Sequence, residues 1–346
     1  MPTGLSLLSA LGAASFALWV QAAQQPDVSS TLQNILANTH GSPLYTYPTD
    51  LTRGIVPKMI HSHNDYWRDI PFYSALSVGA VSVEADVWLY NDTLYVRRTS
   101  LSLLAPEESK LTRSSGTQQV GHEESALTTS RTFESLYITP ILETLQAQNP
   151  PSPFLTAPTK NGVFDTASTQ TLYLFVDVKT AGEATWPSVV SALGPLRDAG
   201  YLTTVNSSGI PVRGPVTVIG TGNTPLDQVQ TVTAGRDYFY DAPLPFLDTT
   251  FANITSAVSP IASYDFNAVF GAVPGTQLND IQLATLRAQV AAAHAKGILV
   301  RYWDLPGWPI STRNGIWRQL RNEGADFVNA DDLLAAAGFS GESEYW

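Results

Sequence analysis

Residues 81–90 read "VSVEADVWLY", a run in which apolar and β-branched side chains surround two carboxylates. The composition and length of this run predict a buried β-strand. Because side chains alternate between the two faces of a strand, Glu84 and Asp86 point to the same face. A buried carboxylate costs several kcal/mol unless it is paired with a cation or bound to a metal. The run therefore predicts a polar site built into the interior of a folded domain.

Similar apolar, β-rich runs recur along the chain and alternate with helix-like segments. One such segment, "LNDIQLATLRAQVAAAHAKG", ends at Gly297, as a helix C-terminus commonly does. The predicted strands are residues 58–61, 80–89, 94–96, 172–178, 216–220, 238–240, 262–264, 298–303 and 327–329. This repetition predicts a single closed (β/α)₈ barrel, a TIM barrel, over residues 57–340, with a doubly wound open sheet as the alternative.

The composition is typical of a globular protein with a substantial core. Of 346 residues, 44% are hydrophobic and only 14% are charged. The formal net charge of −11 argues against nucleic acid as a partner. It also means that an anionic substrate needs a locally positive site. There is no cysteine, so the core must hold the fold without disulfides. We expect a monomer.

Residues 1–22 predict a secretory signal peptide, because an apolar run is followed by small residues and then by polar sequence. A membrane anchor is the alternative, although the run is slightly short for a bilayer span of roughly 20 residues. Residues 23–56 follow as an N-terminal extension. Glycosylation sequons agree with export and lie at Asn91, Asn206 and Asn253. We therefore expect a secreted glycoprotein.

Polar side chains close three of the predicted strands, where a barrel enzyme places its catalytic groups. The first strand ends at His61, and in "LYLFVDVKT" Asp177 and Lys179 share one face. Together with Glu84 and Asp86, this face offers the oxygen ligands that Mg²⁺ or Ca²⁺ prefers. We expect a divalent metal site, with a structural salt-bridge network as the alternative.

Two histidines flank the Glu84 strand in the sequence, His61 before it and His122 after the next strand. With a metal and Lys179, they would form a complete apparatus for cleaving a phosphodiester. One histidine would act as base or nucleophile and the other would protonate the leaving oxygen. A catalytically inactive binding module is the alternative. A glycosidase is disfavoured, because two carboxylates on one strand face lie too close to straddle a sugar.

These motifs, in this order, resemble the phosphatidylinositol-phospholipase-C-like (PLC-like) phosphodiesterases, which include glycerophosphodiester phosphodiesterases and sphingomyelinase-D-type phospholipases. Residues 61–96, "HSHNDYWRDIPFYSALSVGAVSVEADVWLYNDTLYV", look most like the altered inheritance of mitochondria protein 6 branch. Residues 324–333, "GADFVNADDL", are similar to the last strand and turn of glycerophosphodiesterases. The resemblance covers the chain from about Pro57 to Asp332 and implies a TIM barrel.

The resemblance implies roles for individual residues. Metal ligands would be Glu84, Asp86 and Asp177, and the acid/base pair would be His61 and His122. Substrate contacts would be Lys179, which holds the phosphate, Arg301 and Trp303. The branch motif also contains His63, Asn64 and Asp65, without individual roles.

The implied substrate is a lipid- or glycerol-derived phosphodiester, with transient contact to a membrane surface. The chain departs from the glycerophosphodiesterases at one point. Their opening His-Arg-Gly is here His-Ser-His, so the arginine that would contact phosphate is absent. This argues against a glycerophosphodiester as the specific substrate.

Residues 94–124 read "LYVRRTSLSLLAPEESKLTRSSGTQQVGHEE". In related sequences we expect the third strand to continue directly into Gly-His, and here polar residues separate the two. Removing residues 96–119, or equivalently 97–120, restores the continuous sequence. Codons for Val-Arg can match a eukaryotic splice donor, and a codon for Gln can match a splice acceptor. We interpret the segment as a retained intron, with a surface insertion looped out of the barrel as the alternative.

Overall fold

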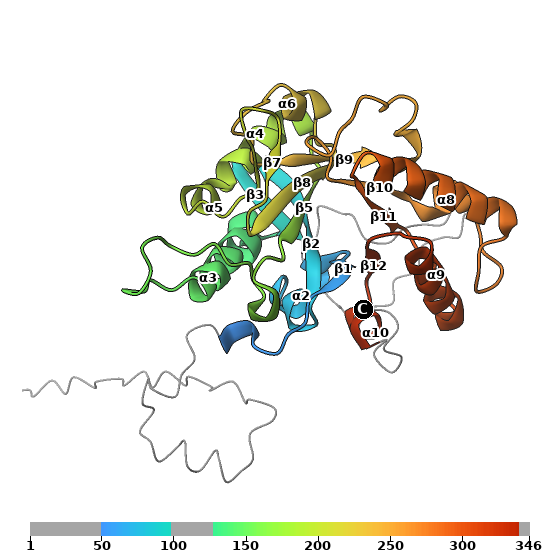
Figure 1. Ribbon diagram of the computed structural model, residues 1–346, viewed down its shortest axis with the longest axis horizontal. Helices are drawn as coiled ribbons and strands as arrows, with labels where there is room; N and C mark the ends of the chain where they lie inside the picture. The colour runs from blue at the N-terminus through green and yellow to red at the C-terminus, as the bar shows by residue number, and fades with distance from the viewer. Residues whose placement is uncertain (1–49, 98–126, 339–346) are drawn as a thin grey trace, which may run out of the picture. The chain divides into compact units, whose positions relative to one another are not determined.

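The computed structural model of the protein describes residues 50–97 and 127–338. They form a mixed α/β domain around a large, mostly parallel sheet (Figure 1). The predicted signal peptide, His122 and residues 98–119 of the interrupting segment lie outside the described residues. Among the helices of the described residues, none has the length and apolar character needed to span a bilayer.

In the described part of the chain, eight parallel strands follow the order β11, β10, β9, β8, β5, β2, β1, β12. They are β1 Lys58–Ser62, β2 Ala80–Tyr90, β5 Leu172–Val178, β8 Val216–Gly222, β9 Phe239–Pro243, β10 Ile261–Asp265, β11 Leu299–Trp303 and β12 Val328–Ala330. Each of them matches a predicted strand. A mostly parallel sheet is therefore confirmed.

Closure of this sheet into a barrel is not shown. The order of paired strands ends at β11 on one side and β12 on the other. Two backbone hydrogen bonds connect the chain just before β12 to β11, from the N–H groups of Asp326 and Phe327 to the carbonyl of Val300, at 3.0 and 3.3 Å. They do not amount to a ladder.

The predicted strand at residues 94–96 exists, but it lies outside the parallel series. It is β3 Thr93–Arg97, which pairs antiparallel with β2 and with β4 Leu127–Thr132. Asn91 and Asp92 connect β2 to β3 with φ values of 47° and 60°. Two left-handed residues in succession form a tight hairpin turn. A parallel pairing would need a crossover of about a dozen residues or more.

The hairpin also bears on the interrupting segment. Arg97 of β3 pairs with Leu127 of β4, so these two residues, which flank residues 98–126 in the sequence, lie side by side in the sheet. A connection of any length can join two neighbouring strand ends. The pairing of β3 with β4 is compatible with both interpretations of the segment, a retained intron and a looped-out insertion.

Helices follow most strands and cover the sheet (Figure 1). They are α2 Tyr73–Ser77, α3 Thr139–Gln148, α4 Gly182–Ala192, α5 Gly194–Asp198, α6 Leu226–Gln230, α7 Phe266–Phe270, α8 Asp280–Ala295, α9 Ile310–Asn322 and α10 Leu333–Gly338. A short hairpin of β6 Thr204–Val205 and β7 Pro211–Val212 precedes β8. Helix α8 begins with a capping box between Asn279 and Gln282.

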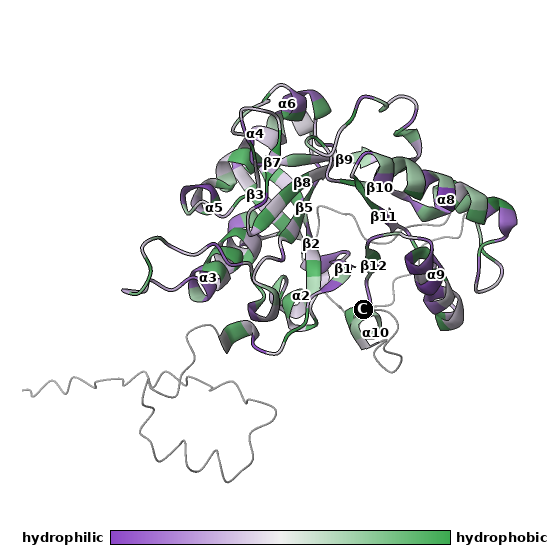
Figure 2. Ribbon diagram, in the orientation of Figure 1, coloured by the Kyte–Doolittle hydropathy of each residue, from purple (hydrophilic) through white to green (hydrophobic). Residues whose placement is uncertain are grey.

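The core lies on both faces of the parallel strands. Along β2, every residue from Ala80 to Val87 is buried, as expected for a parallel sheet covered on both sides. Figure 2 shows apolar colour over much of the strands and polar colour over much of α9. Polar side chains of these strands, Glu84 and Asp86 among them, are therefore exceptions inside an apolar framework.

Candidate active site

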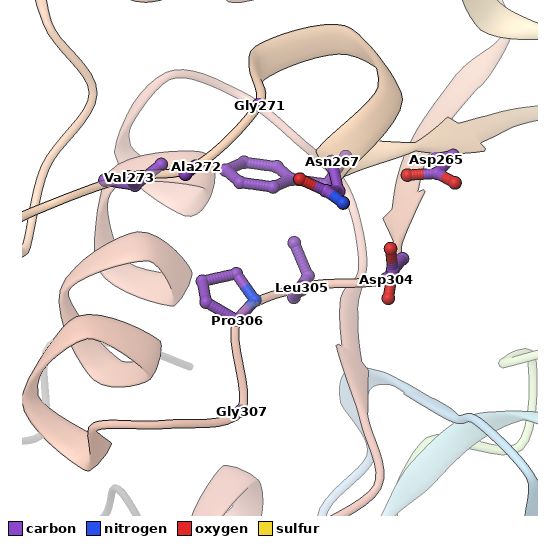
Figure 3. Close-up of a pocket in the computed structure, with 10 residues that line it drawn as sticks. Asp265, Asn267, Gly271, Ala272, Val273, Asp304, Leu305, Pro306 and Gly307 are labelled. Atoms are coloured by element: carbon purple, nitrogen blue, oxygen red, sulfur yellow. The ribbon is translucent and has the colours of Figure 1, made fainter. Parts of the chain in front are cut away.

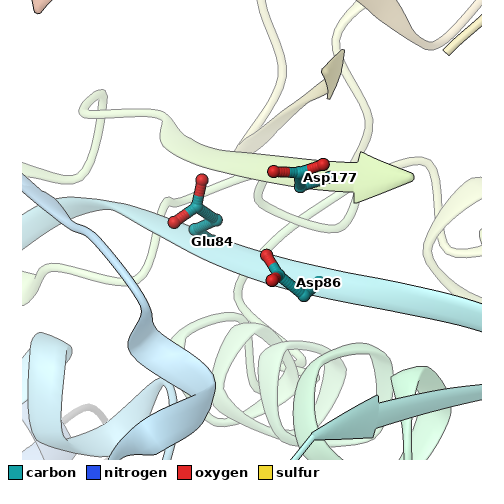
Figure 4. Close-up of side chains that lie close together, drawn as sticks. All are labelled: Glu84, Asp86 and Asp177. Carbon is teal, nitrogen blue, oxygen red and sulfur yellow. The ribbon is translucent and has the colours of Figure 1, made fainter. Parts of the chain in front are cut away.

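Three carboxylates meet where the middle of β2 lies beside the carboxyl end of β5 (Figure 4). Glu84, Asp86 and Asp177 each offer an oxygen, and these oxygens all lie within 4.8 Å of one another. The strand register explains this, because Asp86 pairs directly with Asp177. Glu84 and Asp86 are only 4% and 2% exposed. Close, buried like charges repel strongly unless a cation compensates them.

Lys179 supplies part of that compensation. Its Nζ lies 2.6 Å from Asp177 Oδ2 and 3.2 Å from Asp86 Oδ2. Burial lowers the pKa of Lys179, but the two carboxylates outweigh burial and raise it. Burial and Asp86 together raise the pKa of Asp177 to about 6, even with Lys179 beside it. One ammonium therefore does not fully neutralise the pair.

Arg301 brings a second cation, but it shares its charge with another carboxylate. It is 2% exposed, and its Nη2 lies 3.6 Å from Asp241 Oδ2. Among the described residues around the triad, the carboxylates of Glu84, Asp86, Asp177 and Asp241 thus face Lys179 and Arg301 as permanent cations. The triad keeps an excess of negative charge and presents only hard oxygen donors. A divalent cation such as Mg²⁺ or Ca²⁺ fits such a donor set.

His61 lies beneath the triad and is fully buried. Its Nδ1 is 2.7 Å from Ser82 Oγ, and its ring packs edge-on against Phe175 with 4.9 Å between centroids. Its Nε2 is 4.0 Å from Glu84 Oε2 and makes no hydrogen bond. Burial and Arg301 lower the pKa of His61 to about 3. The ring is therefore neutral near pH 7.

His63 lies on the other side of the same Glu84 oxygen. Its Nε2 is 3.9 Å from Glu84 Oε2, and its Nδ1 is 2.8 Å from Asp331 Oδ1. Its side chain is 21% exposed. Burial lowers the pKa of His63, but Glu84 and Asp331 outweigh burial and raise it. The contact with Asp331 fixes the ring so that Nε2 faces the triad.

The remaining residues of the branch motif lock the turn that carries His63. Asn64 has φ 50°, and its backbone N–H donates to Glu84 Oε2 at 2.9 Å. The Asn64 side chain donates to Asp331 at 2.9 Å and accepts from Tyr66 Oη at 2.7 Å. Asp65 is fully buried and accepts hydrogen bonds from Ser62 Oγ, the Phe72 backbone and Tyr137 Oη. These residues fix the turn that carries His63, but they do not line the cavity.

A cavity of about 340 Å³ opens beside the triad. It brings together five of the eight predicted site residues and His63, and its lining includes His63, Glu84, Asp177, Lys179, Arg301 and Trp303. His61 does not line it. The predicted partner His122 lies outside the described residues.

Sequence reasoning did not assign the contribution of His63, nor that of Asp331. Both residues lie within the quoted motifs, "HSHNDYWRD" and "GADFVNADDL". The contact between them joins segments 268 positions apart in the chain. Spacing along the sequence carries no signal for such a pairing, although β1 and β12 are neighbours in the sheet.

The fold defines a mixed α/β protein, and comparison with known families identifies a phosphodiesterase-like domain in it. Residues 49–112 and 108–241 match the AIM6-like phosphodiesterase domain. The chain is 53% identical to the altered inheritance of mitochondria protein 6 homolog of Arthroderma benhamiae, over 90% of this chain and 93% of that protein. It is 34% identical to altered inheritance of mitochondria protein 6 of Eremothecium gossypii, over 84% of this chain and 71% of that protein. The Saccharomyces cerevisiae protein of the same name is 28% identical, over 83% and 72%.

The chain therefore belongs to the altered inheritance of mitochondria protein 6 family, as its motifs predict.

Proposed function

We propose that this protein is a metal-dependent phosphoric diester hydrolase that acts on a lipid- or glycerol-derived phosphodiester. The observation that carries the proposal is the triad of Glu84, Asp86 and Asp177. Two of its members, Glu84 and Asp177, line one cavity with Lys179 and His63. The domain match supports the same class of chemistry. A divalent cation held by the triad would neutralise charge that develops on a phosphoryl oxygen.

Lys179 and Arg301 are the donors for the phosphate. Arg301 is held in place from three directions: Nε donates to Ser263 at 2.9 Å, Nη1 donates to Asn329 at 3.0 Å, and the guanidinium lies 4.6 Å from the centroid of the Phe175 ring. A fixed donor costs no reorganisation when charge develops, so its stabilisation goes to the transition state. Trp303 lines the same cavity and would contact an ester substituent.

Acid/base chemistry needs a histidine that reaches the substrate. Sequence reasoning predicts His61 and His122 for these roles. The contacts favour His63 over His61, because His63 lines the cavity and is oriented by Asp331, whereas His61 is sealed between Ser82 and Phe175. His63 would give or take the proton of a phosphoester oxygen. His122 keeps its predicted role as the partner.

The attacking group is either water or a neighbouring hydroxyl of the substrate. In both cases a new P–O bond forms as the bond to the leaving oxygen breaks. One histidine takes the proton that the attacking oxygen loses, and the other gives a proton to the leaving oxygen. Attack by water gives a phosphomonoester and an alcohol. Attack by the neighbouring hydroxyl gives a cyclic phosphate and an alcohol, so product analysis separates the two routes.

Three further expectations stay proposals. The eight parallel strands form a closed barrel, which the hydrogen bonds from Asp326 and Phe327 to Val300 support. The protein is exported after removal of residues 1–22 and acts as a glycosylated monomer. Residues 96–119 derive from a retained intron. Intact mass and peptide mapping of the protein from its native source test the last two directly.

The proposed activity is tested with the full-length chain and a panel of phosphodiesters, with Mg²⁺, Ca²⁺ or a chelator added. We expect turnover that needs a divalent cation and that falls at least about a hundredfold in Asp177→Asn. Glu143→Asn, an exposed position on α3, is the matched control and should keep full activity. Binding of a phosphodiester without turnover in any metal would favour an inactive binding protein instead.

A further inference from the structure

The branch motif ends near an arginine whose side chain folds back over the motif. Arg68 follows the short 3₁₀ helix η3 Asp65–Trp67 in "HSHNDYWRD". Its side chain is only 17% exposed. Nε donates to Ser62 Oγ at 2.9 Å and lies 3.4 Å from Asp65 Oδ1. Ser62 Oγ in turn donates to Asp65 Oδ1 at 2.6 Å. One nitrogen of the guanidinium is therefore fixed to the turn that carries His63.

Another nitrogen of the same guanidinium holds the turn that follows β12. Nη2 of Arg68 donates to the carbonyl oxygens of Asp331 at 3.1 Å and of Ala330 at 3.5 Å. The backbone N–H of His63 also donates to the Ala330 carbonyl, at 3.2 Å. Arg68 and Ala330 are 262 positions apart in the sequence. Arg68 therefore joins the turn of His63 to the turn of Asp331.

Packing alone does not hold Asp331 in place. Its side chain is 62% exposed, and together with His63 it lines a cavity of about 220 Å³. Residues 304–307 line the same cavity and also a second one of about 430 Å³, which extends towards α7 (Figure 3). Since open space lies on one side of the Asp331 turn, hydrogen bonds must fix its position.

The position of Asp331 matters because its Oδ1 orients His63, at 2.8 Å from Nδ1. The contact that one ring nitrogen of a histidine makes determines how the other nitrogen is presented. Arginine suits the joining role, because its planar guanidinium presents several donors in fixed directions, whereas lysine has a single ammonium. Arg68 lines neither the cavity beside the triad nor the cavity of Asp331. Any effect of Arg68 on a reaction must therefore pass through other residues.

We propose that Arg68 is a positioning residue, which sets the contact between His63 and Asp331 by holding the backbone of one turn against the other. The proposal rests on the proposed function in one respect, namely that His63 is a reacting group. The carboxylate of Asp331 orients the ring, and Arg68 determines where that carboxylate lies. The departure from His-Arg-Gly also gains a role, because Ser62 is the acceptor that fixes Nε of Arg68.

The kinetic test measures kcat and KM of full-length Arg68→Gln, alone and combined with Asp331→Asn. We expect Arg68→Gln to lower kcat about tenfold and to change KM by less than about twofold. In the Asp331→Asn background it should cost less than about twofold, because both changes act on the same contact. Arg68→Lys, which keeps the charge, should not restore kcat. Arg287→Gln is the matched control and should keep full activity, since Arg287 is 59% exposed and pairs with Glu323.

A measurement without turnover keeps this test apart from the proposed function. In full-length protein labelled with ¹⁵N-histidine, the ring signals of His63 are identified by their loss in His63→Gln. We expect the Nδ1 signal of His63 to move in Arg68→Gln and to stay in Arg287→Gln. A moved signal in a protein that turns over no diester with any metal would support the positioning role and contradict the proposed function.

Three results would overturn the positioning role: His63 signals that stay in place in Arg68→Gln, an equal loss of kcat with and without Asp331→Asn, or full recovery of kcat in Arg68→Lys. If Arg68→Gln does not fold, Ser62→Ala takes its place. It removes only the acceptor of Nε, so we expect a smaller shift of the His63 signal in the same direction.

Discussion

His61 and His63 leave the same strand end and lie almost equally far from Glu84 Oε2, at 4.0 and 3.9 Å, yet their surroundings are opposite. His61 is fully buried between Ser82 and Phe175, and its pKa is lowered to about 3. His63 lines the cavity, and its pKa is raised. Distance to a carboxylate therefore does not define the role of a histidine in this site. We propose that access to the cavity does.

The backbone explains the difference. His61 is still part of β1, so its side chain points into the packed interior. The chain then turns at Asn64, which has a left-handed conformation and donates its N–H to Glu84. This turn carries His63 out of the strand and up to the mouth. Two histidines of one motif thus differ in exposure: His61 is buried beside Glu84, and His63 lines the cavity.

Removing the carboxylate of Glu84, which both histidines face, should have the largest effect on turnover. We expect Glu84→Gln to reduce metal-dependent turnover by roughly a thousandfold, because it removes a charged ligand from the triad and weakens the acceptor of the Asn64 N–H. The measurement is kcat at saturating Mg²⁺ or Ca²⁺. Glu143→Gln, exposed on α3, is the control. Near wild-type turnover in Glu84→Gln would rule out the triad as a catalytic metal site.

The buried position of His61 is tested by measuring the stability of a variant. His61→Ala should lower the free energy of unfolding by about 3 kcal/mol, since it leaves a cavity against Phe175 and removes the partner of Ser82. Denaturant unfolding followed by fluorescence measures it. His294→Ala is the control, because that side chain is 41% exposed and pairs with Asp326 near the surface. A loss in His61→Ala no larger than in the control would show that His61 is not a packing residue.

The proposed role of His63 is tested through Asp331, which contacts His63 but does not belong to the triad. Asp331→Asn should lower kcat by about ten- to a hundredfold, because loss of the orienting charge disturbs a reacting group without removing it. Asp332→Asn, the neighbouring position, which pairs with Arg313, is the control. An effect on KM alone would mean that Asp331 contacts the substrate and does not orient His63.

A smaller effect is expected from Gly222 on β8. It has φ +63°, and a β-carbon there would overlap Asp177 Oδ1. Gly222→Ala should therefore displace one triad carboxylate and weaken the affinity of the site for a divalent cation by about tenfold. Titration calorimetry with the metal measures this. Gly209→Ala, also at positive φ but with no neighbour within reach, controls for backbone strain alone.

Sequence reasoning predicts local features well and long-range ones poorly. Periodicity and apolar content locate every predicted strand, and the two-residue spacing in β2 places Glu84 and Asp86 on one face. The same spacing in "LYLFVDVKT" selects Asp177 and Lys179, and the family resemblance implies their roles. The direction of β3 depends on the turn at Asn91 and Asp92, which the prediction of a barrel strand ignores. The role of His63 depends on Asp331 from the far end of the chain, which no local pattern contains.

The most direct test of the account compares His61→Gln and His63→Gln side by side, with kcat measured at saturating metal and stability measured by denaturant unfolding. We predict that His63→Gln loses about a hundredfold or more in kcat and keeps its stability. His61→Gln should lose stability and keep most of its kcat while folded. The reverse pattern, with kcat lost in His61→Gln and kept in His63→Gln, would contradict the account.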